Sequence, residues 1–170
     1  NGPMLVAAVR ETGSVAINLG IARDEESDLT RLISAGLEYD VLLLSGGVSA
    51  GVLDLVPGVL KSLGVREVFH KVQLKPGKPI WFGRPERDGR QTLVFGLPGN
   101  PVGSWVCFEL FVRPALAKLA GRSETSGERT SAVLLTRVTQ RGDRPTYFPA
   151  AYRQAESGPT VEPLAWQGSA

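Results

Sequence analysis

The stretch Val41-Leu-Leu-Leu-Ser-Gly-Gly-Val-Ser-Ala-Gly51 decides the fold class of this 170-residue chain. Its first four residues are all apolar, which is typical of a short central strand covered on both faces. Glycines follow directly, and an apolar helical pattern begins near Leu53. A buried strand that turns tightly into a helix is the repeating unit of α/β proteins. We therefore expect a mainly parallel sheet between two layers of helices.

The segments on either side of this stretch alternate between helical and extended patterns. Apolar residues at helical spacing predict helices over 3–12, 24–37, 53–63 and 102–119. Apolar and β-branched runs predict strands over 14–19, 41–44, 67–74, 80–82 and 92–95. Asp24 is the expected N-cap of the second helix. Pro114 should kink or break the last helix, because proline lacks an amide hydrogen and clashes with the preceding turn.

The end of the chain has a different pattern. The polar, glycine-bounded stretch 121–128 has the composition of a linker, so we place an αβα domain at 1–122 and a partial β domain at 123–170. Short strands are expected there over 130–139, 146–151 and 160–164. Three strands make a poor independent domain, so this tail is expected to be an incomplete small β domain.

Composition excludes several classes of protein. The chain is 42 % hydrophobic and 21 % charged, as in a globular protein rather than a disordered or fibrous one. One cysteine and one histidine exclude a disulfide scaffold and a metal site built from several such residues. The net charge of +2 is too balanced for a nucleic-acid-binding surface, and no apolar run or leader indicates a membrane or secretion. We expect a cytoplasmic protein, and the initial Asn1 indicates a fragment of a longer one.

Two glycine-containing loops follow predicted strands and lead into helices. The chain has three candidate loops, and these two are the first and the third in chain order. The first loop is Ser45-Gly46-Gly47-Val48-Ser49-Ala50-Gly51, with Asp54 three residues further on. The third loop is Gly96-Leu97-Pro98-Gly99-Asn100-Pro101. Glycines let a backbone approach a ligand closely, and unpaired amides at a helix N-terminus attract anions. Alternatively, the first loop is only a tight turn and the third only a helix start, with Asn100 as cap and Pro101 in the first turn.

Between them in the sequence, the lysine loop Lys75-Pro76-Gly77-Lys78-Pro79 joins two predicted strands. Its prolines stiffen the backbone, which gives two ammonium groups a defined spacing for a phosphate or another oxyanion. The alternative is a solvated hairpin with two surface lysines. Because parallel sheets bind ligands beyond the carboxyl ends of their strands, we expect the three loops to line one crevice that suits an anionic, phosphate-bearing molecule.

Several residues with chemical potential are better explained by structural roles. His70 lies in a strand pattern, and Cys107 lies among apolar residues, as an inert core thiol would. For Trp81 and Trp105 we favour core packing over stacking on a heterocycle. A single histidine leaves no Ser-His-Asp triad.

The three loops, in this order and at these separations, resemble those of the molybdopterin molybdenumtransferases, the MoeA family that includes the E domain of gephyrin and the plant molybdenum insertases. Asn1 and the segments 19–24 and 108–116 are also similar to that family. The resemblance is strong over residues 1–122 and loose over the tail. It implies the three-layer αβα molybdopterin-binding fold shared with the MoaB and MogA proteins, followed by part of a small β-barrel domain.

The resemblance also implies an activity, the insertion of molybdate into adenylylated molybdopterin with release of AMP and with Mg²⁺ assisting. The implied catalytic residues are Asp54, near the phosphate or its Mg²⁺, and Lys75 and Lys78, which would hold phosphate or molybdate charge. The implied substrate-binding residues are Ser45, Gly46, Gly47, Ser49, Gly51, Pro98, Gly99, Asn100 and Pro101. The implied partners are the pterin nucleotide, a second copy of the full-length protein in a homodimer, and molybdopterin adenylyltransferase, with no nucleic acid and no membrane.

Two positions depart from the family pattern. Val52 stands where the family commonly has an acidic residue, and Gly103 where it usually has a serine. Both favour an alternative function, a non-catalytic molybdopterin-binding or scaffolding module. A second alternative is a molybdopterin adenylyltransferase, which would favour Thr-Gly-Gly-Thr-Gly in the first loop and needs neither the lysine loop nor the tail. The family's first two domains are absent from this chain, so we expect it to bind ligand without completing the reaction alone.

Overall fold

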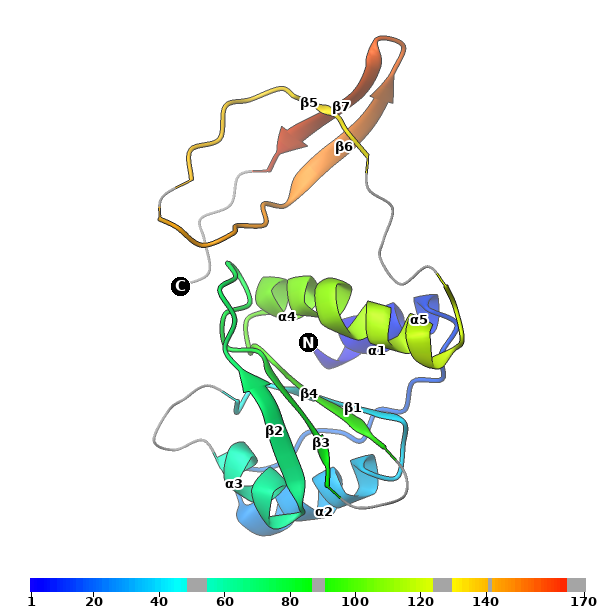
Figure 1. Ribbon diagram of the computed structural model, residues 1–170, viewed down its shortest axis with the longest axis vertical. Coiled ribbons are helices and arrows are strands. Elements are labelled where there is room, and N and C mark those ends of the chain that lie inside the picture. Colours follow the sequence, from blue (N-terminus) through cyan, green and yellow to red (C-terminus); the bar gives the residue numbers. More distant parts are fainter. Residues whose placement is uncertain (49–54, 87–90, 124–129, 141, 165–170) are drawn as a thin grey trace.

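The computed structural model describes residues 1–48, 55–86, 91–123, 130–140 and 142–164. A four-stranded sheet lies between two layers of helices (Figure 1). Its strands, in spatial order, are β1 (Val41–Ser45), β4 (Leu93–Leu97), β3 (Trp81–Pro85) and β2 (Val65–His70). One face is covered by α1 (Gly2–Glu11), α4 (Pro101–Cys107) and α5 (Arg113–Leu119), the other by α2 (Glu26–Gly36) and α3 (Leu55–Ser62). The predicted three-layer αβα class is confirmed.

The sheet is mixed. Strands β1 and β4 are parallel, with Val41 opposite Leu93 and Ser45 opposite Leu97. Strand β3 is antiparallel to both β4 and β2. The expectation of a mainly parallel sheet is therefore wrong for the described strands, because the segments that join β2 to β3 and β3 to β4 are too short for the crossover that a parallel pair needs. The carboxyl ends of β1, β4 and β2 nevertheless lie at the same edge of the sheet.

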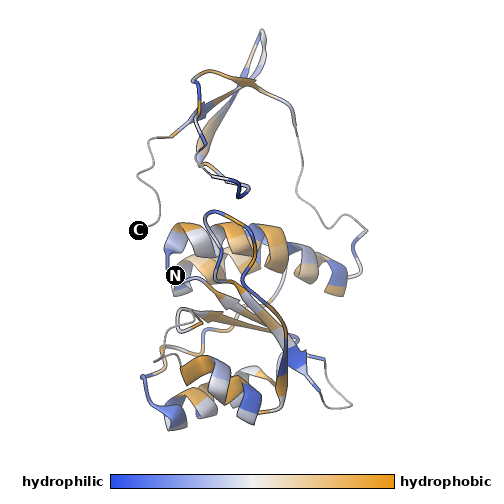
Figure 2. Ribbon diagram, turned by 60° about the vertical axis from the view of Figure 1, so that its left-hand side comes forward, coloured by the Kyte–Doolittle hydropathy of each residue, from blue (hydrophilic) through white to orange (hydrophobic). Residues whose placement is uncertain are grey.

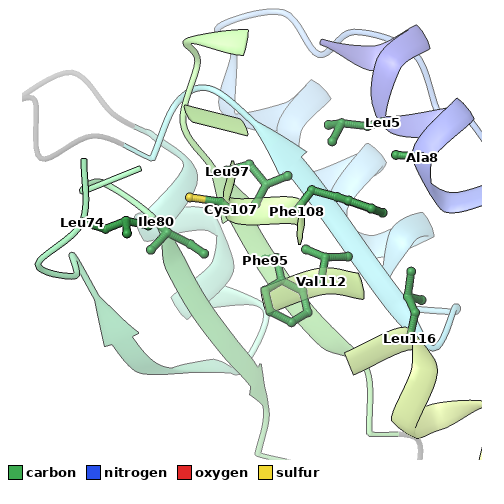
Figure 3. Close-up of a cluster of buried hydrophobic side chains, with 10 residues drawn as sticks. All are labelled: Leu5, Ala8, Leu74, Ile80, Phe95, Leu97, Cys107, Phe108, Val112 and Leu116. Carbon is green, nitrogen blue, oxygen red and sulfur yellow. The ribbon is translucent and has the colours of Figure 1, made fainter. Parts of the chain in front are cut away.

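Two apolar clusters fill the spaces between the layers. In the first, Leu5 of α1 packs with Phe95 of β4 and Phe108 (Figure 3). In the second, Ile33 of α2 packs with Val94 of β4 on the opposite face. Neighbouring residues of β4 point to opposite faces because side chains alternate along a strand. Figure 2 shows the hydrophobic residues concentrated in the helices and strands of this layered unit.

A π-helical segment, η1 (Phe108–Val112), joins α4 to α5. The Arg113 amide donates to the Phe108 carbonyl, five residues earlier. Pro114 has no amide hydrogen, and its ring would crowd the carbonyl four residues before it in a regular helix. The wider turn relieves this conflict. The helical residues run without interruption through Pro114, so a break there is wrong, and the irregularity takes the form of one widened turn before the proline.

Other predicted elements need correction. Residues 14–19 form no strand, since no described strand pairs with them, and Val15 is 89 % exposed. The N-cap of α2 is Glu25, not Asp24. In the first turn of α2, the Asp28 carboxylate accepts a hydrogen bond from the Arg23 amide at 2.9 Å. Strand β2 ends at His70 because Lys71 has a φ of 65°, outside the extended region.

The tail contains a second sheet, in the order β5 (Val133–Leu134), β7 (Gly158–Pro163) and β6 (Ala150–Ala155). The strand predicted over 160–164 overlaps β7, whereas 130–139 contributes only two strand residues. The segment 146–151 contributes an isolated bridge at Thr146 and the start of β6. These strands show no closed barrel, so the barrel domain stays a prediction. No helix in the described ranges is long and apolar enough to cross a membrane.

Candidate functional site

The first and third loops leave the parallel strands side by side. The Gly46 amide donates to the Leu97 carbonyl at 3.1 Å, which extends the pairing of β1 with β4 beyond Ser45. A Cβ added to Gly99 would lie 3.8 Å from the Gly46 Cα. Gly46 and Gly47 have φ values of 85° and 67°, which favour glycine because a Cβ strains this region. The described parts of the two loops are therefore in contact.

Asn1 connects these loops to α4. Its side-chain Nδ2 lies 2.7 Å from the Ser45 Oγ, 2.9 Å from the Gly99 carbonyl oxygen and 3.3 Å from the Ser104 Oγ. Ser104 is fully buried, and its hydroxyl also donates to the Pro98 carbonyl. One carboxamide at the start of α1 thus joins the first loop, the third loop and α4. Sequence reasoning did not place Asn1 or Ser104 in the site. The one signal for Asn1 was its match to the family pattern.

The lysine loop packs against α4 at the same edge. The Cys107 Sγ lies 3.5 Å from the Gly77 carbonyl oxygen. A Cβ added to Gly103 would lie 3.7 Å from the Gly77 nitrogen and 3.2 Å from the Pro98 Cβ. Gly103 therefore lies between the lysine loop and the third loop, where the absence of a side chain leaves room for both. The structure brings the described parts of all three predicted loops together.

The lysine loop carries two positive charges, on Lys75 and Lys78. Lys75 is half-buried and Lys78 is exposed, and among the described residues no carboxylate pairs with either side chain. The start of α4 offers less than predicted. The Asn100 Oδ1 accepts from the Gly103 amide at 3.1 Å, so the predicted cap occupies one donor that an anion would otherwise use. The lysines thus contribute positive charge at this edge.

The structural roles predicted for nearby residues hold, with one exception. His70 supports the first loop, since its Nε2 lies 3.1 Å from the Val48 carbonyl oxygen. Cys107 is fully buried, and burial raises the pKa of its thiol to about 12, as expected of an inert core thiol. Trp81 is buried and donates to Glu67 at 2.8 Å. Trp105 is 38 % exposed, so core packing was wrong for that residue.

Residues 49–54 lie outside the described part of the chain, and they include Ser49, Gly51, Val52 and Asp54. Within the described ranges, no three His, Cys, Asp or Glu residues lie together as a metal site. The oxygens around Asn1 belong to hydroxyl and carbonyl groups, whereas Mg²⁺ sites usually include a carboxylate. A magnesium site therefore depends on Asp54 and stays a prediction.

Comparison with known proteins points to molybdopterin chemistry. Residues 1–118 match the family model of a probable molybdopterin binding domain. The molybdopterin molybdenumtransferase of Synechocystis sp. is 41 % identical over 108 residues, which cover 63 % of this chain and 27 % of that protein. The Staphylococcus aureus (strain MRSA252) protein of the same name is 30 % identical over 173 residues, which cover 99 % of this chain and 40 % of that protein. The chain thus spans well under half of either relative.

Solved structures give the same picture. The molybdopterin biosynthesis MoeA protein from Pyrococcus horikosii has a TM-score of 0.76 and 32 % identity, over 98 % of this chain and 38 % of that one. A molybdopterin biosynthesis protein from Mycobacterium abscessus has a TM-score of 0.57 and 16 % identity, over 71 % of this chain and 83 % of that one. The second likeness supports the fold alone.

Proposed function

The chain belongs to the family of probable molybdopterin binding domains, and on this premise we propose that it acts in molybdenum cofactor biosynthesis. The proposed reaction is the insertion of molybdate into adenylylated molybdopterin with release of AMP. One observation carries the proposal. Two glycine loops and the lysine loop, which carries Lys75 and Lys78, meet at one edge of the sheet, and an oxyanion-bearing nucleotide requires positive charge and close backbone approach. We infer that the nucleotide carries a pterin because the names of the relatives refer to molybdopterin.

The proposed roles follow from where the residues lie. Lys75 and Lys78 attract the phosphate or molybdate charge as point charges. The backbone of the first loop from Ser45 to Gly51, and that of the third loop from Pro98 to Pro101, lies against the pterin nucleotide. Asn1 holds these two loops in register. Asp54 carries the one carboxylate in this proposal that would hold Mg²⁺, and that ion would neutralise phosphate charge when bound.

The wider organisation is also part of the proposal. Residues 1–122 form the pterin-binding domain, and residues 123–170 form part of a small β-barrel. The native gene product that contains this chain works in the cytoplasm as a homodimer and receives its substrate from a molybdopterin adenylyltransferase. A negatively charged substrate explains why the lysines of the site have no acidic partners among the described residues.

Calorimetric titration with AMP and with molybdate tests the binding site. We expect Lys75→Ala and Lys78→Ala to weaken AMP binding, with a loss that shrinks as salt screens the attraction. Lys118→Ala, at the exposed end of α5, is the matched control for a lysine away from the site. An equal loss of AMP affinity in all three variants would show that binding depends only on the net charge of the protein. That result would refute the proposed binding site.

Turnover is tested separately in the native gene product. Metal insertion is measured with adenylylated molybdopterin, molybdate and Mg²⁺, for the wild type and Asp54→Asn. We expect normal AMP binding and a normal melting temperature in this variant, with insertion lost. Insertion at the wild-type rate would remove the proposed role of Asp54.

One observation favours a second function, a binding or scaffolding module without turnover. Gly103 presents no hydroxyl between Pro98 and Gly77, at the position where the family usually has a serine. Tight AMP binding without insertion in the wild-type gene product, restored by Gly103→Ser, would identify this position as the cause. Binding without insertion in both proteins would support the scaffolding module.

A further inference from the structure

Among the described residues, the tail pairs with the lysine loop through backbone hydrogen bonds at Lys75. The Lys75 amide donates to the Pro145 carbonyl at 3.0 Å, and the Tyr147 amide donates to the Lys75 carbonyl at 2.8 Å. These two bonds form an isolated parallel bridge between Lys75 and Thr146. We call residues 145–147 the strap. In Figure 1 this part of the tail lies above the loop that joins β2 to β3.

The strap restricts the direction of the Lys75 side chain. Each peptide unit that flanks Lys75 is held by one bond, so both backbone dihedrals of that residue are restrained, and the Cα–Cβ direction follows from them. The next residue, Pro76, is buried and has a fixed φ. Two residues after Lys75, the Gly77 carbonyl accepts from the Cys107 thiol of α4 at 3.5 Å. The loop at Lys75 is therefore fixed between α4 and the strap.

The strap itself has local support. The Thr146 Oγ1 donates to the Arg144 carbonyl at 3.1 Å, and the Gln140 Nε2 donates to the same carbonyl at 2.6 Å. Pro145 restricts the backbone between these contacts. These features hold the strap in the conformation that meets Lys75, which lowers the entropy cost of the two bonds.

Lys78 is held differently. Its carbonyl accepts from the Val72 amide at 3.0 Å, and the Ile80 amide donates to the Gly77 carbonyl at 3.2 Å. Both bonds stay within the segment that connects β2 to β3. The two lysines of one loop therefore have separate supports, since the tail supports Lys75 and the β2–β3 connection supports Lys78.

We propose that the strap positions Lys75 for the anionic ligand, so that the tail contributes to the site through the backbone amide of Tyr147. The identity of the ligand, an oxyanion-bearing pterin nucleotide, rests on the proposed function. The positioning of Lys75 by the strap is independent of that function, because it is argued from the backbone contacts alone. Tyr147 acts through Lys75 and has no catalytic role of its own.

The first test needs no ligand. Tyr147→Pro removes the amide that bonds to Lys75, whereas Tyr147→Ala keeps that amide and removes the ring. Acetylation of each lysine by a small amine-reactive ester is followed by mass spectrometry. We expect the Lys75 rate to change by about threefold or more in Tyr147→Pro and to stay constant in Tyr147→Ala, with Lys78 unchanged in both. Pro145→Gly, which loosens the strap without removing a bonding group, should change the rate less in the same direction. An unchanged Lys75 rate in Tyr147→Pro and Pro145→Gly overturns the proposal.

The second test uses AMP binding in a double-mutant cycle. Tyr147→Pro should weaken AMP binding by about three- to tenfold in the wild type and in the Lys78→Ala background, and should have no further effect in the Lys75→Ala background. It should also lower the salt dependence of binding as Lys75→Ala does. An equal loss in all three backgrounds indicates a general structural effect and overturns the proposal. If the wild type binds neither AMP nor molybdate, the proposed function fails, while the acetylation rates still decide the role of the strap.

Discussion

Replacing Asn1 with alanine removes the carboxamide that joins the first loop, the third loop and α4. The Nδ2 group has two hydrogens and lies within bonding distance of three oxygens. A hydrogen bond contributes about 0.5–1.5 kcal/mol net, so the loss of two lowers the free energy of unfolding by about 2 kcal/mol. In a chain of this size, that change lowers the melting temperature by about 4–8 °C.

Asn1→Asp separates the hydrogen bonds from the shape of the side chain. Aspartate has nearly the same shape, but it has no donor and directs a charge at the Gly99 carbonyl oxygen, now 2.9 Å from the Nδ2. Two facing acceptors repel each other, so we expect a larger loss than for alanine. The loops that Asn1 joins should also bind AMP more weakly in both variants.

Thermal unfolding by circular dichroism and calorimetric AMP titration measure these effects. Asn18→Ala is the matched control, since the Asn18 Oδ1 accepts from the Gly20 amide in an exposed segment that none of the described strands pairs with. An Asn1→Asp variant that melts with the wild type would refute the reasoning. So would an Asn1→Ala variant no less stable than Asn18→Ala.

Three further predictions concern packing and titration. Gly96→Ala should lower the free energy of unfolding by about 1–3 kcal/mol in denaturant titrations, because the new Cβ would lie 2.5 Å from the Val48 Cγ1. Gly58→Ala, in α3 with no atom within 4 Å of the new Cβ, should instead raise it by about 0.5–1 kcal/mol. Cys107 should react with a thiol reagent at pH 8 only after unfolding. Burial raises its folded-state pKa from 9.0 to about 12, so the unfolded chain releases this proton first and stability falls as the pH rises from 9 to 12. This part of the slope, at most about 1.4 kcal/mol per pH unit, should be absent in Cys107→Ala.

The parts of the fold that depend on local sequence were predictable. The apolar run of β1, the glycines after it and the Asn100 cap of α4 each act over a few residues. The failures are non-local. Residues 14–19 alternate as a strand would, but a strand needs a neighbour, and none of the described strands pairs with them. The end of β2 depends on the positive φ of Lys71. A positive φ is uncommon for lysine, so the sequence does not predict it.

The candidate site was predictable to a similar extent. The loop sequences indicated close backbone approach and positive charge, and the described parts of the three loops do meet. Asn1 lies 98 residues from Gly99 in the chain, so no local pattern shows their contact. The contact of the strap with Lys75 is equally non-local. Only the folded chain reveals which residues hold the loops.

The π-helical turn has a further consequence for how the chain tolerates insertions and deletions. An α-helix advances about 100° per residue, so the extra residue in η1 shifts the phase of α5 relative to α4 by about that angle. In this phase, Cys107 faces the lysine loop while Leu116 packs in the first apolar cluster. Deleting one residue from η1 would give a more regular helix, yet it would rotate one of these two side chains away from its neighbours. The irregular turn therefore sets the angular alignment between the ligand loops and the core.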